Sequence, residues 1–439
     1  MGTKKSWLKS YRELKRRIGR RKKKDLALDE ESRELFEKMK AEFVEEVVGE
    51  HIGLVKDWLH SLERAFERAR EALGAKGVML PKEFKSFFED PEAHLRKKLF
   101  IYAHDLIRGR LKLEEFESRA SAAVKTSLMT NARTLYQTWV YACAVTGLAE
   151  RGYRLVYPDD LYLHIERTGK QKAGAIPPNA VLSNGYRAVS LFIEAPRPLG
   201  WEDSGDLSRV WGLYVALRPD MLAYGGRVLN IVDLSEPTKP ISRPDMIIEC
   251  KELSDWYERV REIKGPIVKP LTAEEWRHRW LVGLWDGLAE VLGVEREEAL
   301  ESIKERKGLR LRDRQIVLLY KKFYEPRRMI LVSRAAIPRE VKEELEGQGV
   351  EVVDGVEFDE RRLSPLVDAL EDVASIENSR TEFVELTEEG RKLLAELSTA
   401  LSREGVRTAI PRLIEECLRL GLERRDLLLD RLRRECRRG

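Results

Sequence analysis

Apolar residues recur at three- and four-residue steps through Glu31–Phe66, which is the period of an amphipathic α-helix. Pro81 and Pro91 interrupt this pattern. The same spacing resumes over Leu99–Ile107 and from Leu113 toward Met129, so two further helices are expected there. This part of the chain contains no catalytic motif, and it predicts a helical domain for binding or positioning.

The pattern changes near residue 153, where short β-branched and aromatic runs appear between Gly, Pro and Asn residues. These runs predict strands at Tyr153–Tyr157, Tyr186–Glu194, Trp211–Leu217 and Met246–Glu249. A helical pattern returns over Thr272–Leu292.

A strand–helix–strand unit follows farther along the chain. Met329–Ser333 predicts a buried strand, and Pro338 suits the first turn of a helix because its missing N–H is not needed there. Gly347 ends that helix, and Val350–Val353 is the next expected strand. Such a unit implies parallel strand pairing, so the fold class is predicted as α/β with a layered core.

The last residues, from 381 onward, predict a separate, charged and mostly helical module. Glu382–Leu386 reads as a short strand, followed by helices over Glu388–Leu401 and Ala409–Leu420. This order resembles ribbon-helix-helix modules, which dimerise and contact DNA. Glu382 and Glu385 suit phosphate poorly, so a plain helical hairpin for dimerisation or core packing is favoured over that resemblance.

Charge is distributed unevenly along the chain. The net charge is +4, but residues 1–24 contain twelve Lys or Arg and one acid. Such an arm suits phosphate backbones through counterion release, and a solvated tail is the alternative. The candidate nucleic-acid-binding residues are Lys15, Arg16, Arg17, Arg20, Arg21, Lys22, Lys23 and Lys24.

Composition limits the remaining classes. No apolar run is long enough to span a membrane, and the scattered cysteines indicate reduced thiols, so a cytoplasmic protein is expected. Abundant charge with few Gln and Asn is typical of thermophilic proteins. The histidines lack metal-ligand spacing, and the phosphate-loop motif is missing, so any ATPase motor would be a separate protein.

The candidate chemistry lies in the segment Arg243-Pro-Asp-Met-Ile-Ile-Glu-Cys-Lys251. Glu249 and Lys251 share one face of the expected strand, where burying both is costly without a partner or a task. The carboxylate can hold a divalent metal, and the ammonium can orient water or neutralise charge in a phosphoryl transition state.

A second carboxylate is needed for a metal site. Asp245 lies roughly 13 Å from Glu249 along an extended strand. Asp220 follows the apolar run Leu213–Leu217, and pairing beside Met246–Lys251 would bring it opposite Glu249 at about 5 Å. Asp220 is therefore the expected ligand, with Asp245 as the alternative if the strand bends. Glu166 and Glu194 are minor candidates near strand ends.

Pro219-Asp220 followed by Glu249-Cys250-Lys251 resembles the signature of PD-(D/E)XK nucleases. Tyr136-Gln137-Thr138-Trp139 resembles the Tyr-Glu-X-Trp setting of an acidic helix residue in that family, with Gln137 in place of the acid. The resemblance covers about residues 131–356. It implies a restriction-endonuclease-like mixed-sheet domain at 126–365, between a basic arm and helical domain at 1–125 and a C-terminal module at 380–439.

The resemblance implies a metal-dependent endonuclease that hydrolyses DNA with Mg²⁺ or Mn²⁺. Asp220, Glu249 and the Cys250 backbone carbonyl would hold the metal, Lys251 would act on the water or the scissile phosphate, and Gln137 would support them. A homodimer is a possible assembly, since two sites cut two strands. The alternative, which the Gln137 departure keeps open, is an inactive DNA-binding or assembly protein that reuses the fold.

Overall fold

The computed structural model describes residues 6–18, 28–166, 176–195, 218–232, 241–262, 310–376 and 388–403, with Cys417, Leu420 and Arg424. Residues Met1–Glu382 form one compact unit and Phe383–Gly439 a second. The statements below concern the first unit unless the second is named.

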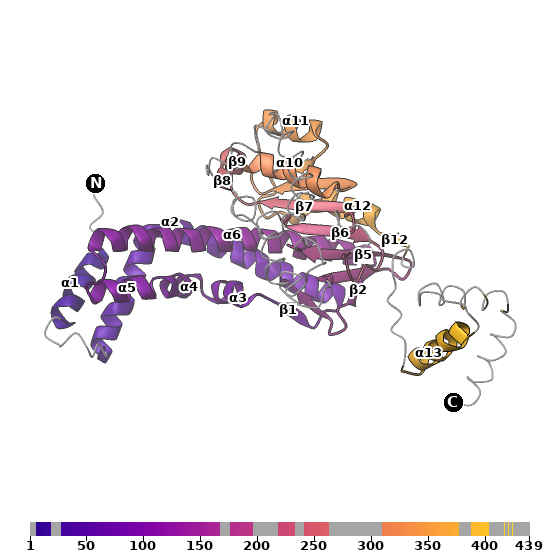
Figure 1. The fold of residues 1–439 in the computed structure, drawn as a ribbon. Coiled ribbons are helices and arrows are strands. Elements are labelled where there is room, and N and C mark those ends of the chain that lie inside the picture. Colours follow the sequence, from indigo (N-terminus) through magenta and orange to yellow (C-terminus); the bar gives the residue numbers. More distant parts are fainter. Residues whose placement is uncertain are drawn as a thin grey trace, which may run out of the picture. The chain divides into compact units, whose positions relative to one another are not determined.

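An eight-stranded mixed sheet is the centre of the first unit, so the protein has an α/β fold (Figure 1). The strand order is β11-β10-β7-β6-β5-β4-β2, and β12 pairs with β5. β7, β10 and β11 are parallel to one another, whereas the other neighbours in the sheet pair antiparallel. The strands are β2 Arg154–Tyr157, β4 Ala180–Ser183, β5 Arg187–Ile193, β6 Met221–Gly225, β7 Met246–Lys251, β10 Arg328–Ser333, β11 Glu351–Val353 and β12 Ser375–Ile376.

Helices cover both faces of this sheet because its strands are apolar on both sides. Met246, Ile248 and Cys250 of β7 pack into the core that includes α6 (Leu113–Glu150) and α12 (Ser364–Val373). Ile247 packs into the opposite core, with α10 (Asp313–Tyr324) and α11 (Arg339–Gly347). Alternation along a strand therefore directs Glu249 and Lys251 toward the face that carries α10.

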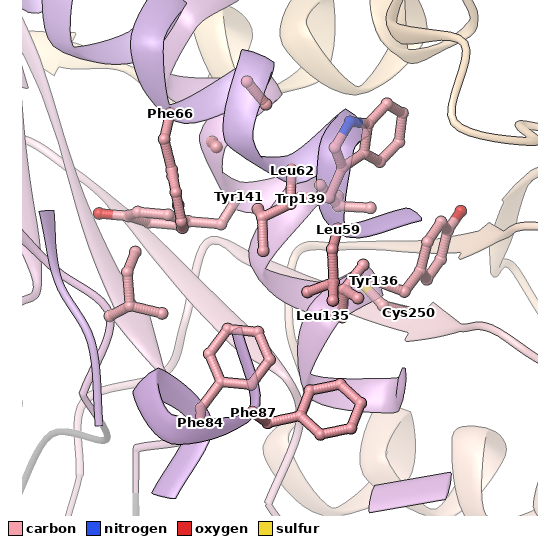
Figure 2. Close-up of a cluster of buried hydrophobic side chains, with 14 of the residues drawn as sticks. Leu59, Leu62, Phe66, Phe84, Phe87, Leu135, Tyr136, Trp139, Tyr141 and Cys250 are labelled. Atoms are coloured by element: carbon pink, nitrogen blue, oxygen red, sulfur yellow. The ribbon is translucent and has the colours of Figure 1, made fainter. Parts of the chain in front are cut away.

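Two long helices, α2 (Glu30–Leu73) and α6, lie side by side (Figure 1). The Asp29 side chain accepts a hydrogen bond from the Ser32 N–H and caps the start of α2, while Gly74 ends it in a left-handed conformation. The second half of α6 is buried almost throughout, because it lies between α2 and the sheet. In Figure 2, Leu135 and Tyr136 of α6 lie beside Cys250 of β7.

Shorter helices pack along the α2–α6 pair: α3 Lys82–Glu89, α4 Pro91–Lys98 and α5 Phe100–Ile107. Helix α1 (Ser6–Ile18) is held by Trp7, which is fully buried with ring centroids 5.2 Å from Phe43 and 5.4 Å from Phe116. Over residues 6–18 the basic segment is therefore a packed helix rather than a disordered tail, and its basic side chains are exposed.

The remaining described elements are short. They are the paired strands β1 Gly77–Met79 and β3 Tyr162–His164, the paired strands β8 Val260–Glu262 and β9 Arg310–Arg312, and the 3-10 helices η2 Trp256–Glu258 and η3 Glu360–Leu363.

Most expected elements that fall on described residues are present with small shifts of their ends, including the parallel unit β10–α11–β11. One expectation needs correction. The strand beside β7 is β6, which begins directly after Asp220, rather than a strand that Asp220 ends. The run Leu213–Leu217 and the helix expected over Thr272–Leu292 lie outside the described residues.

In the second unit, α13 (Glu388–Arg403) confirms the helix expected from Glu388. The expected strand Glu382–Leu386 and the helix Ala409–Leu420 lie outside the described residues, apart from single positions. Among the helices that the structure describes, none has the length and apolar character that a bilayer crossing requires.

Candidate active site

The register of β6 against β7 brings two carboxylates together. Met221 pairs with Ile248 and Leu222 with Ile247, so one further step places Asp220 opposite Glu249. Directly opposed residues of an antiparallel pair share one face, with Cβ atoms about 5 Å apart. The contact expected between Asp220 and Glu249 is therefore present.

Backbone amides fix both carboxylates. Asp220 Oδ2 accepts a hydrogen bond from the Cys250 N–H at 2.8 Å, and Glu249 Oε2 accepts one from the Asp220 N–H at 3.2 Å. Asp220 and Glu249 are only 5% and 4% exposed. Each acid is thus held by the other strand, which sets their separation without help from a mobile loop.

Lys251 lies on the same face of β7, two residues beyond Glu249. Its Nζ donates to Glu249 Oε1 at 2.8 Å and lies 5.5 Å from the centre of the Trp256 ring. Lys251 is 3% exposed, and the aromatic ring and the carboxylate compensate for part of the cost of burying its charge. The Trp256 indole N–H donates to Ser333 Oγ at 3.2 Å, which fixes the ring.

Burial and proximity disfavour the negative charge of the acidic pair. Burial, followed by the negative charge of Glu249, raises the pKa of Asp220 to about 8. Arg133, Lys251 and the hydrogen bond from the Cys250 N–H oppose this rise but do not cancel it. A buried acid whose pKa is raised beside a second acid favours additional positive charge, which a proton or a cation can supply.

Gln137 reaches the same place from α6. Its Nε2 donates to the Asp220 backbone carbonyl at 2.9 Å, and the Glu194 N–H donates to the same oxygen at 2.9 Å. Gln137 is buried and lacks a charge, so it positions the start of β6 and does not act as a base. Tyr136 and Trp139 on the same turn are core side chains, stacked with ring centroids 6.0 Å apart.

The structure places the other sequence candidates elsewhere. Asp245 precedes β7 at the opposite end of the strand, where its Oδ2 accepts a hydrogen bond from the Gly225 N–H at 2.8 Å. The other carboxylate oxygen, Asp245 Oδ1, lies 3.2 Å from Arg327 Nε. In the basic arm, Lys15, Arg16 and Arg17 are exposed on α1, and Arg20–Lys24 lie outside the described residues.

Three residues near the site were not singled out from the sequence, or only weakly. Arg133 lies one helical turn before Gln137, with Nη2 3.7 Å from Glu194 Oε1. Burial alone would lower the pKa of Arg133, but Asp220, Glu194, Glu252 and Glu249 together raise it above its ordinary value. The spacing of Arg133 to Gln137 on one helix face is the signal that could have found it.

Glu194 and Tyr320 complete the surroundings of the acidic pair Asp220 and Glu249. Glu194 is buried and has a φ of 44°, an unusual conformation for a residue with a side chain. Its carboxylate lies 3.5 Å from Arg218 Nη2. Burial, with smaller contributions from Glu249 and Asp220, holds the pKa of the Tyr320 hydroxyl well above its usual range. No sequence pattern marks Tyr320, because only the packing of α10 brings it near the site.

The donor set suits a hard divalent cation. Among the described residues, no group of three or more His, Cys, Asp and Glu side chains has the geometry of a metal site. Mg²⁺ commonly uses one or two carboxylates and completes its shell with water and substrate phosphates. Asp220 and Glu249 would supply those carboxylates, and the raised pKa of Asp220 shows that the pair favours added positive charge.

Searches against protein-family models, curated proteins and solved structures each return no match. Function therefore has to be inferred from the geometry and chemistry of the site.

Proposed function

We propose that this protein is a metal-dependent endonuclease of the PD-(D/E)XK type, with a restriction-endonuclease-like domain that hydrolyses DNA phosphodiester bonds. The observation that supports the proposal most is the placement of Asp220 opposite Glu249, with Lys251 Nζ 2.8 Å from Glu249 Oε1. Two acids and one ammonium group on adjacent strands are the groups that such hydrolysis requires.

Each side chain has a distinct task in this proposal. Asp220 and Glu249 would hold Mg²⁺ or Mn²⁺, with the Cys250 carbonyl as a further oxygen ligand. The bound cation supplies Lewis-acid stabilisation of the phosphate and a more acidic water. Lys251 neutralises negative charge that builds on the phosphate oxygens as a water oxygen bonds to phosphorus and the ester oxygen leaves. Gln137 keeps Asp220 in register.

Binding of the substrate backbone would involve the exposed cations of α1. Lys15 and Arg16 lie on its surface with Lys9 and Arg12, while Arg17 pairs with Glu31. Contacts of this kind to phosphate do not depend on base sequence, and salt weakens them.

Plasmid cleavage tests the proposal. Supercoiled DNA is incubated with the protein in Mg²⁺ or in EDTA, beside Lys251→Ala and the control Lys342→Ala. Both variants remove a lysine that is paired with a carboxylate. The Lys342 Nζ lies 2.9 Å from Asp354 Oδ1, outside the candidate site. We expect Mg²⁺-dependent nicking that Lys251→Ala lowers by at least about 100-fold and that Lys342→Ala retains.

Retarded migration of DNA without cleavage in any divalent metal would contradict the nuclease assignment. That result would favour the alternative, a DNA-binding or assembly protein that reuses the fold.

A further inference from the structure

Arg133 is a cation beside the acidic pair. It belongs to α6, the helix that also carries the amide bonded to the Asp220 carbonyl. Burial lowers the pKa of Arg133, but the negative charge of Asp220, and then of Glu194, Glu252 and Glu249, more than reverses this effect. The guanidinium therefore lies within the electrostatic field of both candidate metal ligands.

The neighbours of Arg133 leave its hydrogen-bonding capacity largely unused. Glu194 Oε1 lies 3.7 Å from Arg133 Nη2, which is longer than a hydrogen bond. Among the described residues, the Nε of Arg133 has no hydrogen-bond partner. Arg151 shows how an arginine of this protein binds acids that it only neutralises, since its Nη1 donates to Glu371 Oε2 at 2.6 Å. The Nη groups of Arg133 thus keep donors for a ligand that accepts hydrogen bonds.

Arg133 is also the charged side chain of the site that solvent reaches best. Its side chain is 33% exposed, whereas that of Glu194 is 7% exposed and those of Glu249 and Lys251 are 5% and 4% exposed. A polyanion that approaches the buried acids is repelled by them, and an exposed cation beside them offsets that repulsion. The position of Arg133 therefore suits first contact with a negatively charged substrate.

The chemistry of the two groups points to a phosphate. A guanidinium binds phosphate through two parallel N–H···O bonds, because its planar fork matches two oxygens of the anion. A Mg²⁺ ion that two carboxylates hold keeps coordination positions for phosphate oxygens as well. A phosphate diester beside Asp220 and Glu249 would thus be stabilised both by the metal and by Arg133.

We propose that Arg133 binds a backbone phosphate of the DNA at the candidate site through its Nη groups, and so anchors the strand that is cut. The inference rests on the proposed nuclease function for the identity of the substrate. Arg133 has a binding task here, whereas the acidic pair and Lys251 act on the reacting phosphate.

The salt dependence of DNA binding tests the inference separately from cleavage. Fluorescence anisotropy measures the affinity for one blunt duplex at several KCl concentrations, with Ca²⁺ in place of Mg²⁺ so that the carboxylates hold a cation. The slope of log affinity against log salt concentration becomes about 0.9 less steep for each phosphate contact that is lost. We expect Arg133→Gln to show this change and to bind about 10-fold more weakly at low salt.

Two further variants separate charge, geometry and folding. Arg133→Lys keeps the charge, so it should keep the slope of wild type and bind about threefold more weakly because the paired bonds are lost. Arg151→Ala is the matched control. Arg151 pairs with Asp368 and Glu371 and follows Arg133 by about 27 Å along α6, so its loss should leave affinity and slope unchanged.

An unchanged slope in Arg133→Gln, in a protein that cuts DNA with Mg²⁺, would overturn the inference and leave Arg133 as a counter-ion of the acids. A slope that Arg133→Lys or Arg151→Ala reduces as much as Arg133→Gln would also overturn it. The expected slope change without Mg²⁺-dependent cleavage by wild type would contradict the nuclease proposal alone.

Discussion

The burial and the charged neighbours of Asp220 determine the chemistry of the candidate site more than those of any other residue discussed. It is buried opposite Glu249, and burial and that second carboxylate raise its pKa despite the nearby Arg133 and Lys251. A carboxylate in this position either keeps a proton or binds a cation. The same side chain therefore links the stability of the metal-free protein to pH.

We expect Asp220→Asn to alter how stability depends on pH in the metal-free protein. The pKa of Asp220 in the folded protein is raised above its unfolded value, so wild type loses stability as pH rises from about 5 toward 8. Asparagine cannot ionise and removes this contribution. The difference in free energy of unfolding, Asp220→Asn minus wild type, should therefore increase by up to about 1.4 kcal/mol for each pH unit in this window.

Urea denaturation in EDTA at pH 5, 6, 7 and 8 measures the difference. Parallel curves for the two proteins across this range would show that Asp220 ionises normally. The site would then lack the uncompensated charge on which the metal assignment depends.

The sequence predicted that Asp220, Glu249 and Lys251 lie together, because strand alternation and cross-strand distance limit which acids can meet, whereas Gln137 was expected only from the resemblance to PD-(D/E)XK nucleases. It did not identify Arg133 or Tyr320. Their proximity to the acids depends on how α6 and α10 pack on the sheet, and tertiary packing leaves no local pattern in the sequence.

Helix α6 contributes Gln137 to the candidate site and packs against α12. An added Cβ at Gly147 would lie 2.6 Å from Val367 Cγ2, so this glycine permits the close approach of the two helices. Val367 is β-branched and has little freedom to move away. The packing of α12 on α6 therefore depends on a residue without a side chain.

We expect Gly147→Ala to lower the free energy of unfolding by about 1 kcal/mol, since overpacking outweighs the higher helix propensity of alanine. Gly53→Ala is the matched control. A Cβ at Gly53 of α2 meets nothing within 4 Å, so the same substitution should stabilise the protein by about 0.5–1 kcal/mol. Chemical denaturation measures both values, and a neutral or stabilising Gly147→Ala would contradict the packing described here.

The sequence located the start of α6 and predicted helical structure to about residue 150, but not that one unbroken helix spans Leu113–Glu150. The helix runs to Glu150, and its second half is apolar around most of its circumference because it lies between α2 and the sheet. Such a segment loses the amphipathic period that marks a surface helix. β6 was missed for a related reason: its five residues are buried on both faces and show no alternation.

On the scale of the first unit, α6 joins the long-helix pair to the sheet, because it packs against α2 and its Gln137 donates a hydrogen bond to the Asp220 carbonyl.

Titration with Mn²⁺ tests the central claim most directly. Calorimetry at pH 7.5 compares wild type with Asp220→Asn and with Asp245→Asn, the same change at the other end of β7. We predict one Mn²⁺ site in wild type that releases a proton on binding, because the metal displaces the proton of Asp220. Asp245→Asn should retain this site and Asp220→Asn should lose it. Equal Mn²⁺ binding by wild type and Asp220→Asn would contradict the account.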